Sequence, residues 1–162
     1  MREKVTIAPF SGDQAAMQEV ADFYLEVQRG VEAAGQRTFD DKWDTWRELR
    51  QLDTVYVRPG NFWVAHADTA QIVGCIGLRS LDDGKGELGR FGVDVTRRKR
   101  GIGSGLLTEL LDWAGDNNFR ELELETNIAQ DGLPLYERIG FVDTDEHPQD
   151  GVDGDIIMRL QL

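Results

Sequence analysis

The sequence is poor in cysteine and histidine, and it has no long apolar run. It contains one cysteine, Cys75, so no disulfide can form within the chain, which fits a reducing cytoplasm. Cys75 lies in an apolar stretch, which favours a small buried side chain over a nucleophile. No run approaches the roughly 20 residues of a membrane span, and residues 1–7 lack the apolar core of a signal peptide. His66 and His147 stand apart, without metal-ligand spacing. We therefore predict a cytoplasmic protein without a bound metal or a membrane partner.

Basic residues are also scarce, since 18 Lys and Arg face 30 Asp and Glu for a net charge of −12. A nucleic-acid surface needs a broad basic face, so this balance argues against nucleic acid as a partner. The negative charge is compatible with a cationic substrate, although composition alone favours a role in solubility. With 162 residues, of which 40% are hydrophobic and 30% charged, the chain predicts a single soluble domain over residues 1–162.

Hydrophobic periodicity predicts strands and helices in mixed order. Strands are expected at residues 5–8, 62–66, 72–78, 87–95, 121–126, 141–142 and 156–162. Helices are expected from a cap at Ser11 or Asp13 through Val27, from Asp40 or Asp41 through Trp43 and Trp46 to Leu49, over 101–116, and over 133–139. Asn117-Asn118 and Gly140 are expected to end the last two helices. This order predicts a mixed α/β fold with one sheet flanked by helices.

A cationic glycine-rich turn precedes the clearest helix. Four cations, Arg97 to Arg100, are followed by Gly101, Gly103 and Gly105. Glycines let backbone N–H groups approach an anion, and a helix N-terminus adds unpaired N–H groups and a positive dipole end. The pattern predicts a cradle for a phosphorylated ligand. A dinucleotide-binding loop needs Gly-x-Gly-x-x-Gly, and here Leu106 follows Gly105, so the third glycine is misplaced. The Gly-Lys-Ser/Thr of a P-loop does not occur in the sequence. A solvated charge run is the alternative, which the strand before and the helix after disfavour.

The spacing Arg98-x-x-Gly101-x-Gly103 resembles the signature of the GNAT acetyltransferase superfamily. The resemblance extends to a strand at Glu87–Val95 and to Leu-Tyr-Glu-x-x-Gly-Phe at Leu135–Phe141, and it covers about a third of the chain. It implies a single mixed, mostly antiparallel sheet of six to seven strands flanked by about four helices. It further implies an acetyl-CoA-dependent N-acetyltransferase that acts on a primary amine of a small molecule, amino acid or peptide by direct attack.

The resemblance assigns most of the glycine-rich turn and the preceding strand to acetyl-CoA. The pyrophosphate would bind backbone N–H groups of Lys99, Arg100, Gly101, Ile102, Gly103 and Ser104, with Arg98 shaping the loop. The pantetheine arm would pair with the central strand around Val93 and Val95. A bulge near Phe91 or Gly92 would present one N–H to the thioester carbonyl. Family members often carry an asparagine seven residues before the tyrosine; here Ala129 stands there, and Asn127 would replace it if the strand end is shifted.

Two residues match the catalytic positions of the family. Glu87 matches the general base of some members, and burial among apolar neighbours such as Phe91 and Val93 would raise its pKa. A strand-end glutamate in solvent is an equal alternative. Tyr136 matches the tyrosine that protonates the departing thiolate, and its alternative is a core aromatic residue.

The acceptor site of the family is built from the first two helices and the terminal hairpin. Here those segments carry Tyr24, Glu26, Arg29, Trp43, Trp46, Arg47 and the acidic loop 143–155. Two further readings stay open: a non-catalytic acyl-CoA-binding module, which Ala129 motivates, and a phosphate- or nucleic-acid-binding domain that uses the run Arg97–Arg100. Many relatives form dimers, so a homodimer is among the assemblies left open.

Overall fold

Seven strands form one sheet in this computed structural model, which describes residues 3–33 and 47–162. The elements are β1 Val5–Pro9, α1 Gln14–Ala33, α3 Leu52–Val55, β2 Asn61–Ala67, β3 Ile72–Ser80, β4 Lys85–Val93, the 3₁₀ helix η1 Val95–Arg97, α4 Ile102–Asp116, β5 Glu121–Asn127, α5 Leu133–Ile139, β6 Val142–Asp143 and β7 Asp155–Gln161. The mixed α/β fold predicted from the sequence is confirmed. The helix expected from Asp40 or Asp41 lies mostly outside the described residues, including Trp43 and Trp46.

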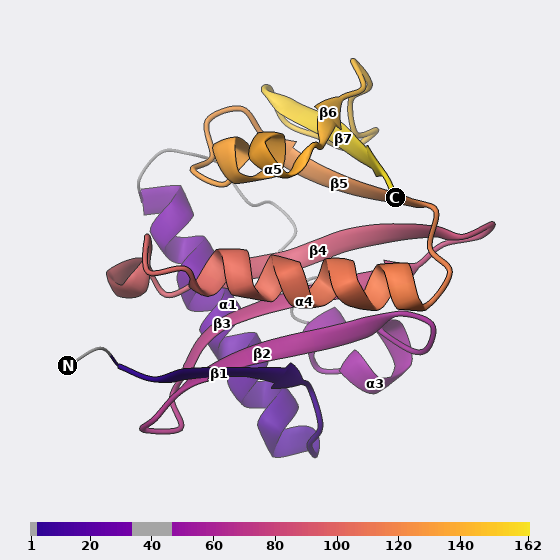
Figure 1. The fold of residues 1–162 in the computed structure, drawn as a ribbon. Helices are drawn as coiled ribbons and strands as arrows, with labels where there is room; N and C mark the ends of the chain where they lie inside the picture. The colour runs from indigo at the N-terminus through magenta and orange to yellow at the C-terminus, as the bar shows by residue number, and fades with distance from the viewer. Residues whose placement is uncertain (1–2, 34–46) are drawn as a thin grey trace.

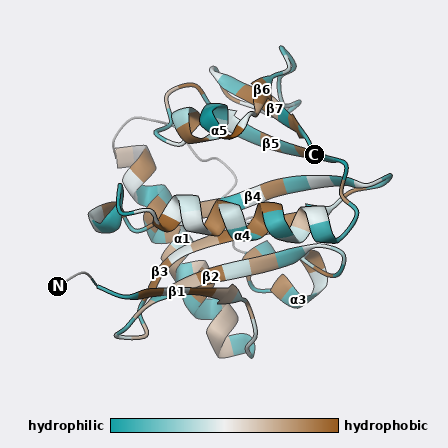
Figure 2. Cartoon of the chain, in the orientation of Figure 1, coloured by the Kyte–Doolittle hydropathy of each residue, from teal (hydrophilic) through white to brown (hydrophobic). Residues whose placement is uncertain are grey.

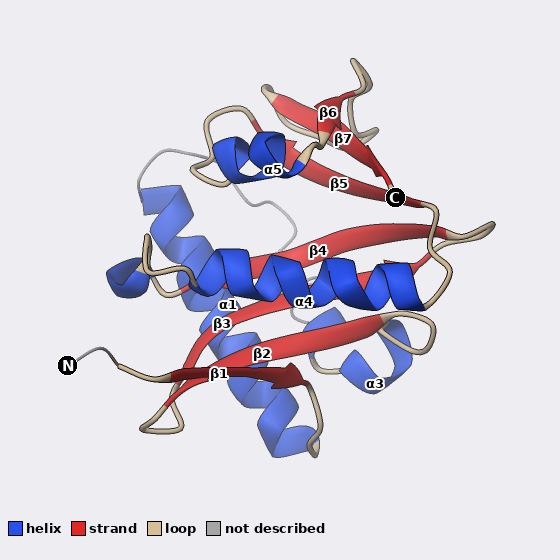
Figure 3. Ribbon diagram, viewed as in Figure 1, coloured by secondary structure: helices blue, strands red, loops and turns tan. Residues whose placement is uncertain are grey.

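The strand order is β1-β2-β3-β4-β5-β7-β6. All neighbouring strands are antiparallel except β4 and β5, which are parallel. Helix α4 crosses one face of the sheet in front of β2, β3 and β4, and α1 crosses behind it (Figures 1 and 3). This mostly antiparallel, seven-stranded sheet with helices on both faces agrees with the predicted architecture.

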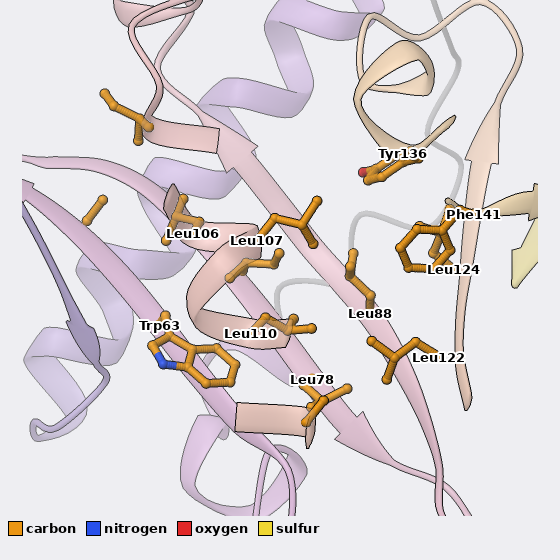
Figure 4. Packing of buried hydrophobic residues seen from close by; sticks show 14 of the residues in the cluster. Trp63, Leu78, Leu88, Leu106, Leu107, Leu110, Leu122, Leu124, Tyr136 and Phe141 are labelled. Carbon is orange, nitrogen blue, oxygen red and sulfur yellow. The ribbon is translucent and has the colours of Figure 1, made fainter. Parts of the chain in front are cut away.

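The two faces of the sheet carry separate hydrophobic cores. Along α4, hydrophobic and hydrophilic residues occur in turn (Figure 2), and Leu106, Leu107 and Leu110 are fully buried on its sheet-facing side. They pack with Trp63 of β2 and Leu122 of β5 in one cluster (Figure 4). On the other face, residues of α1 and α3 pack on β2 and β3 in a second cluster that includes Cys75. The sheet is therefore fixed from both sides, which holds its central strands rigidly.

Helix ends follow local signals in the sequence. The Asp13 carboxylate accepts a hydrogen bond from the Ala16 N–H at 3.0 Å and starts α1. Asn118, with φ of 64°, and Gly140, with φ of 117°, take the left-handed conformation that ends α4 and α5. None of the described helices is both long and apolar enough to cross a membrane.

Strands β4 and β5 separate part of the way along their length. They pair only from Lys85 with Glu121 to Leu88 with Leu124, and beyond that point they diverge (Figure 1). On its other side, β4 carries a bulge. Gly89 faces Gly77 and Gly92 faces Cys75, so two residues of β4 lie opposite a single residue of β3. The divergence leaves one edge of β4 open in the middle of the sheet.

Strand β4 lies two residues earlier in the chain than predicted. It spans Lys85–Val93, whereas the sequence suggested 87–95. The Asp94 side chain accepts a hydrogen bond from the Thr96 N–H at 2.9 Å, which turns the chain into η1 directly after the strand. Val95 consequently begins η1 and is not a strand residue.

Candidate functional site

A cavity of about 960 Å³ opens where β4 and β5 separate. Its walls come from β4, from α1, from the turn between η1 and α4, from α5 and from the loop 148–152. It brings together ten of the residues singled out from the sequence, namely Glu87, Phe91, Val93, Arg98, Lys99, Gly101, Ile102, Gly103, Ser104 and Tyr136. Residues from three separate sequence motifs therefore line one space.

Three predicted residues lie outside this cavity. Val95 is 53% exposed on η1. Arg100 lines a separate recess with Glu3 and residues of β1. Asn127 is buried, and its side-chain amide donates to Asp153 O at 3.1 Å and to Asp155 Oδ1 at 2.9 Å. Its side-chain oxygen accepts from the Ala129 N–H, so the Asn127 side chain holds the β6–β7 loop, and its contact with the cofactor stays a prediction.

The turn before α4 has the backbone geometry of an anion cradle. Lys99 and Gly101 both take positive φ values, 61° and 85°. Gly101 is the N-cap of α4, and no side chain in the described part of the structure caps the helix there. The first N–H groups of the helix have no intrahelical partner, and the dipole adds positive potential. Arg98 forms an ion pair with Asp131 at 3.1 Å, which ties the turn to the loop after β5. An anion such as a phosphate group fits this environment.

Replacing Gly101 by alanine is expected to lower the free energy of unfolding by about 1–2 kcal/mol, because a residue with a Cβ disfavours positive φ. No atom of the described residues lies within 4 Å of a Cβ at this position, so we attribute the expected loss to backbone strain. Urea unfolding measures it. Gly115→Ala in the same helix is the matched control: its Cβ also meets open space, its φ is not positive, and alanine there should stabilise the protein. A Gly101→Ala protein as stable as the wild type would contradict the strain.

The open edge of β4 offers backbone groups to a ligand. The Asp94 N–H donates to Val73 O at 2.9 Å, so alternation along the strand turns the backbone of Val93 away from β3. On that side, none of the described strands pairs with β4 beyond Leu88. An extended ligand could therefore pair with β4 in the manner of an added strand.

The bulge lies beside the buried thiol of Cys75. The thiol donates to Arg90 O at 3.2 Å, and burial raises its pKa to about 12. The side chain is fully buried, as the sequence predicted, and its thiol is a poor nucleophile. Within the bulge, Arg90 and Phe91 have no register partner on β3. Arg90 takes a φ of 52°.

Glu87 lies in the cavity but not among the apolar neighbours expected from alternation. Its Oε1 accepts from Arg79 Nη2 at 2.7 Å, and its side chain is 30% exposed. The bulge breaks the alternation between Glu87 and Phe91. Across the sheet, Glu87 is in register with Arg79 on β3 and Glu123 on β5, and Glu123 in turn pairs with Arg159 of β7 at 2.9 Å. Glu87 is thus a partly exposed carboxylate with one oxygen held by a guanidinium.

Tyr136 is a buried residue of α5 that lines the cavity. Its ring meets Phe91 edge to face at 6.1 Å and Phe141 at 6.0 Å. Figure 4 shows its hydroxyl directed away from Phe141. Within the described part of the chain, no group forms a hydrogen bond with this hydroxyl. Burial raises the pKa of the phenol, which therefore stays protonated at neutral pH.

A cluster of three polar side chains, Arg90, Glu48 and Tyr56, lines the cavity beside the bulge, and the sequence did not suggest it. Arg90 Nε donates to the Glu48 carboxylate, and the Tyr56 hydroxyl donates to the same oxygen at 3.1 Å. Arg90 and Glu48 are 42 positions apart, so no local spacing could have linked them. The one local signal was an arginine next to Gly89 and two residues before Gly92, in a strand rich in glycine. Gln28 of α1 also lines the cavity, and its buried Oε1 has no hydrogen-bond partner among residues 3–33 and 47–162.

The acceptor-side residues suggested by the sequence are only partly brought together. Tyr24 lines the cavity, and so does the loop 148–152 with Asp150. Glu26, Arg29 and Arg47 are exposed and do not line it. Among residues 3–33 and 47–162, no three His, Cys, Asp or Glu side chains are arranged to hold a metal ion.

Comparison with protein families gives a match over most of this chain. The model described as the acetyltransferase (GNAT) family matches residues 17–141. Among curated proteins, the probable N-acetyltransferase camello of Xenopus laevis is 32% identical over 99 residues, which are 58% of this chain and 45% of that protein. The N-acetylaspartate synthetase of Danio rerio is 32% identical over 98 residues, 58% of this chain and 34% of that protein. The chain thus spans less than half the length of these relatives.

Solved structures share the fold over almost the whole chain. A GNAT-family acetyltransferase from Staphylococcus aureus Mu50 aligns with a TM-score of 0.81 at 21% identity, covering 98% of this chain and 99% of that one. The PaiA N-acetyltransferase of Thermoplasma acidophilum, solved in complex with coenzyme A, aligns with a TM-score of 0.72 at 18% identity over 98% and 99% of the two chains. At these identities the likeness concerns the fold.

Proposed function

The chain belongs to the GNAT acetyltransferase family, and we propose that it transfers an acetyl group from acetyl-CoA to a primary amine of a small molecule, amino acid or peptide by direct attack. One observation carries the proposal: a single cavity joins the anion cradle, the open edge of β4, and the side chains of Glu87 and Tyr136. A ligand that is anionic at one end and extended in the middle would reach both side chains.

The parts of acetyl-CoA match, in order, the binding surfaces that line the cavity. Its pyrophosphate would lie on the N–H groups from Lys99 to Ser104 at the N-terminus of α4. Its pantetheine arm carries amide groups that would pair with the backbone of Val93. The thioester would then lie at the bulge, where the Phe91 N–H can donate to the carbonyl oxygen and stabilise the negative charge that develops during attack.

Glu87 is the proposed general base. An amine is mostly protonated at neutral pH and must lose a proton before it attacks. Oε1 of Glu87 is bound by Arg79, so Oε2 would take this proton directly or through a water. The C–N bond then forms and the C–S bond breaks; the thiolate takes up one proton, and a second is released to solvent. The neutral phenol of Tyr136 would assist the departing sulfur.

Acetyl-CoA is expected to stabilise the protein and to be consumed with at least one amine. A ligand present at 100 times its Kd stabilises a protein by about 2.7 kcal/mol, which should raise Tm by several degrees. A panel of amino acids including aspartate, polyamines and short peptides would then be assayed by release of the CoA thiol. Aspartate belongs in the panel because one relative is named N-acetylaspartate synthetase.

The panel also separates the proposal from a non-catalytic acyl-CoA-binding module. Two observations favour that second candidate: Ala129 occupies the place of the family's asparagine, and one oxygen of Glu87 is held by Arg79. Stabilisation by acetyl-CoA without thiol release for any amine would favour the module. If acetyl-CoA neither stabilised the protein nor released its thiol with any amine, both candidate functions would be overturned.

A further inference from the structure

Arg90 occupies an unusual position for a residue with a side chain. It lies in the β4 bulge with a φ of 52°, in the region that glycine adopts freely and other residues avoid. The sequence places glycine at positions 89 and 92 on either side of the bulge, so glycine is readily used in this strand. An arginine at this strained position therefore indicates that its side chain has a specific structural or functional role.

The Arg90 side chain reaches out of the sheet to a group on the α1 side. Its Nε donates to Glu48 Oε2, which also accepts from the Tyr56 hydroxyl. Both charged side chains are largely buried, with 30% of Arg90 and 16% of Glu48 exposed. Burial alone would lower the pKa of Arg90, but Tyr24 and Glu48 outweigh it and raise that pKa, so the guanidinium keeps its charge.

The Glu48 end of this pair is firmly anchored. Leu49, the next residue, is fully buried, and Leu52 and Tyr56 pack in the same cluster below α1. The pair therefore joins the bulge to the hydrophobic core on the α1 face. Because each charge neutralises the other, Arg90 presents no uncompensated positive charge that would call for an anionic acceptor.

The bulge is where the thioester carbonyl would lie, so its backbone orientation matters. Gly92 faces Cys75 on β3 and interacts with its thiol through its backbone. Phe91 has no register partner on β3 and lies two residues before Val93, whose backbone faces away from β3, so by alternation we take the Phe91 N–H to face the cavity. Turning this N–H by a small angle would move it out of line with the carbonyl oxygen.

We propose that the Arg90–Glu48 ion pair is a positioning clamp that fixes the bulge so that the Phe91 N–H points at the thioester carbonyl. This inference rests on the proposed function. Removing one donor to a developing oxyanion lowers kcat by about 100- to 1000-fold, and misplacing it by about 1 Å has an effect near the lower figure. The clamp should therefore govern kcat and leave the binding of acetyl-CoA at the cradle and at Val93 almost unchanged.

Three variants test the clamp: Arg90→Gly, Glu48→Gln and their combination. Arg90→Gly relieves the positive φ while removing the side chain, so a loss would come from the missing side chain and not from backbone strain. We expect kcat with saturating amine to fall about 10- to 100-fold in Arg90→Gly and about 10-fold in Glu48→Gln. The double variant should lose no more than Arg90→Gly, because the two residues act as one unit. Arg90→Lys should keep more activity than Arg90→Gly, and the Kd of acetyl-CoA should change less than about threefold.

A second measurement needs no amine. Amide hydrogen exchange across residues 89–93 should quicken at least about tenfold in Arg90→Gly and Glu48→Gln, since the clamp restrains local opening there. Glu121→Gln is the matched control: it removes an ion-paired carboxylate from β5, outside the cavity, and should leave both kcat and this exchange unchanged.

Several outcomes would overturn the clamp: unchanged exchange in the bulge, wild-type kcat in both single variants, or losses that multiply in the double variant. A loss confined to KM for acidic amines would also overturn it and would make Arg90 an acceptor-binding residue. If the wild type acetylates no amine, the proposed function fails, and the exchange measurement alone then decides whether the clamp restrains the bulge.

Discussion

Replacing Glu87 by glutamine is expected to lower kcat by about 1000-fold, within the range that general acid–base catalysis contributes. Glutamine has the same shape and keeps a side-chain oxygen that can accept from Arg79, but it cannot accept a proton from the amine. The measurement is steady-state turnover with the amine that the panel identifies. Because the acetyl-CoA contacts proposed here lie between Phe91 and Ser104, the Kd of acetyl-CoA should stay within about twofold.

A control variant separates the proton-accepting role of Glu87 from the general loss of one negative charge. Glu109→Gln, on the exposed face of α4, is the control and should behave as the wild type. A Glu87→Gln enzyme that retains a third or more of wild-type kcat would show that another group or a water takes the proton.

Features encoded by contiguous residues could be predicted from the sequence. Helix α5 has the predicted bounds, because Pro134 near its start and Gly140 at its end mark both limits. The cradle was recognisable because its geometry depends on residues that follow one another, from Arg98 to Ser104. The order of strands and helices was sufficient to predict the mixed fold.

Features that depend on distant partners could not be predicted. Asn127 bonds groups 26 and 28 positions away in the β6–β7 loop, and nothing near Asn127 in the sequence signals that loop. The Arg90–Glu48 pair joins positions 42 apart. The shift of β4 has a different cause: Gly86, Gly89 and Gly92 interrupt the alternation by which strand ends and faces are read.

The surroundings of Glu87 illustrate why a motif alone is insufficient to assign chemistry. Simple alternation placed the apolar residues Phe91 and Val93, four and six positions along the strand, on the same face as Glu87, which would have made the carboxylate a buried one. The bulge between Gly89 and Gly92 reverses the face, and the register with β3 brings Arg79 beside it instead. A one-residue irregularity thus exchanges an apolar environment for an ion pair.

Replacing Tyr136 by phenylalanine is expected to lower kcat by about 100-fold with little change in stability. The change removes only the hydroxyl, which forms no hydrogen bond within the described residues, so no buried partner is left unsatisfied. The ring would keep its contacts with Phe91 and Phe141. Thermal unfolding should therefore show nearly wild-type stability, while turnover shows the loss.

The raised pKa of Tyr136 defines what the hydroxyl can do. Burial disfavours the phenolate, so the pKa lies above its ordinary value of 10.0, whereas a free thiol has a pKa of about 8.5. Complete transfer of the phenolic proton to a thiolate would thus be uphill by at least about 2 kcal/mol. Tyr136 is instead suited to donate a hydrogen bond as charge develops on sulfur, and the thiolate then takes its proton from the amine or from solvent. Wild-type kcat should accordingly persist at a pH near 10, where an ordinary phenol would be half ionised.

Phe141→Leu is the matched control for this variant, because it loosens the packing around Tyr136 and leaves the hydroxyl in place. It should lower stability but keep kcat within about threefold of the wild type, since a core substitution acts mainly on packing. A Tyr136→Phe enzyme with the same modest effect on kcat would mean that the ring packs without assisting the leaving group. A large loss in Tyr136→Phe beside a small one in Phe141→Leu would place the effect in the hydroxyl group itself.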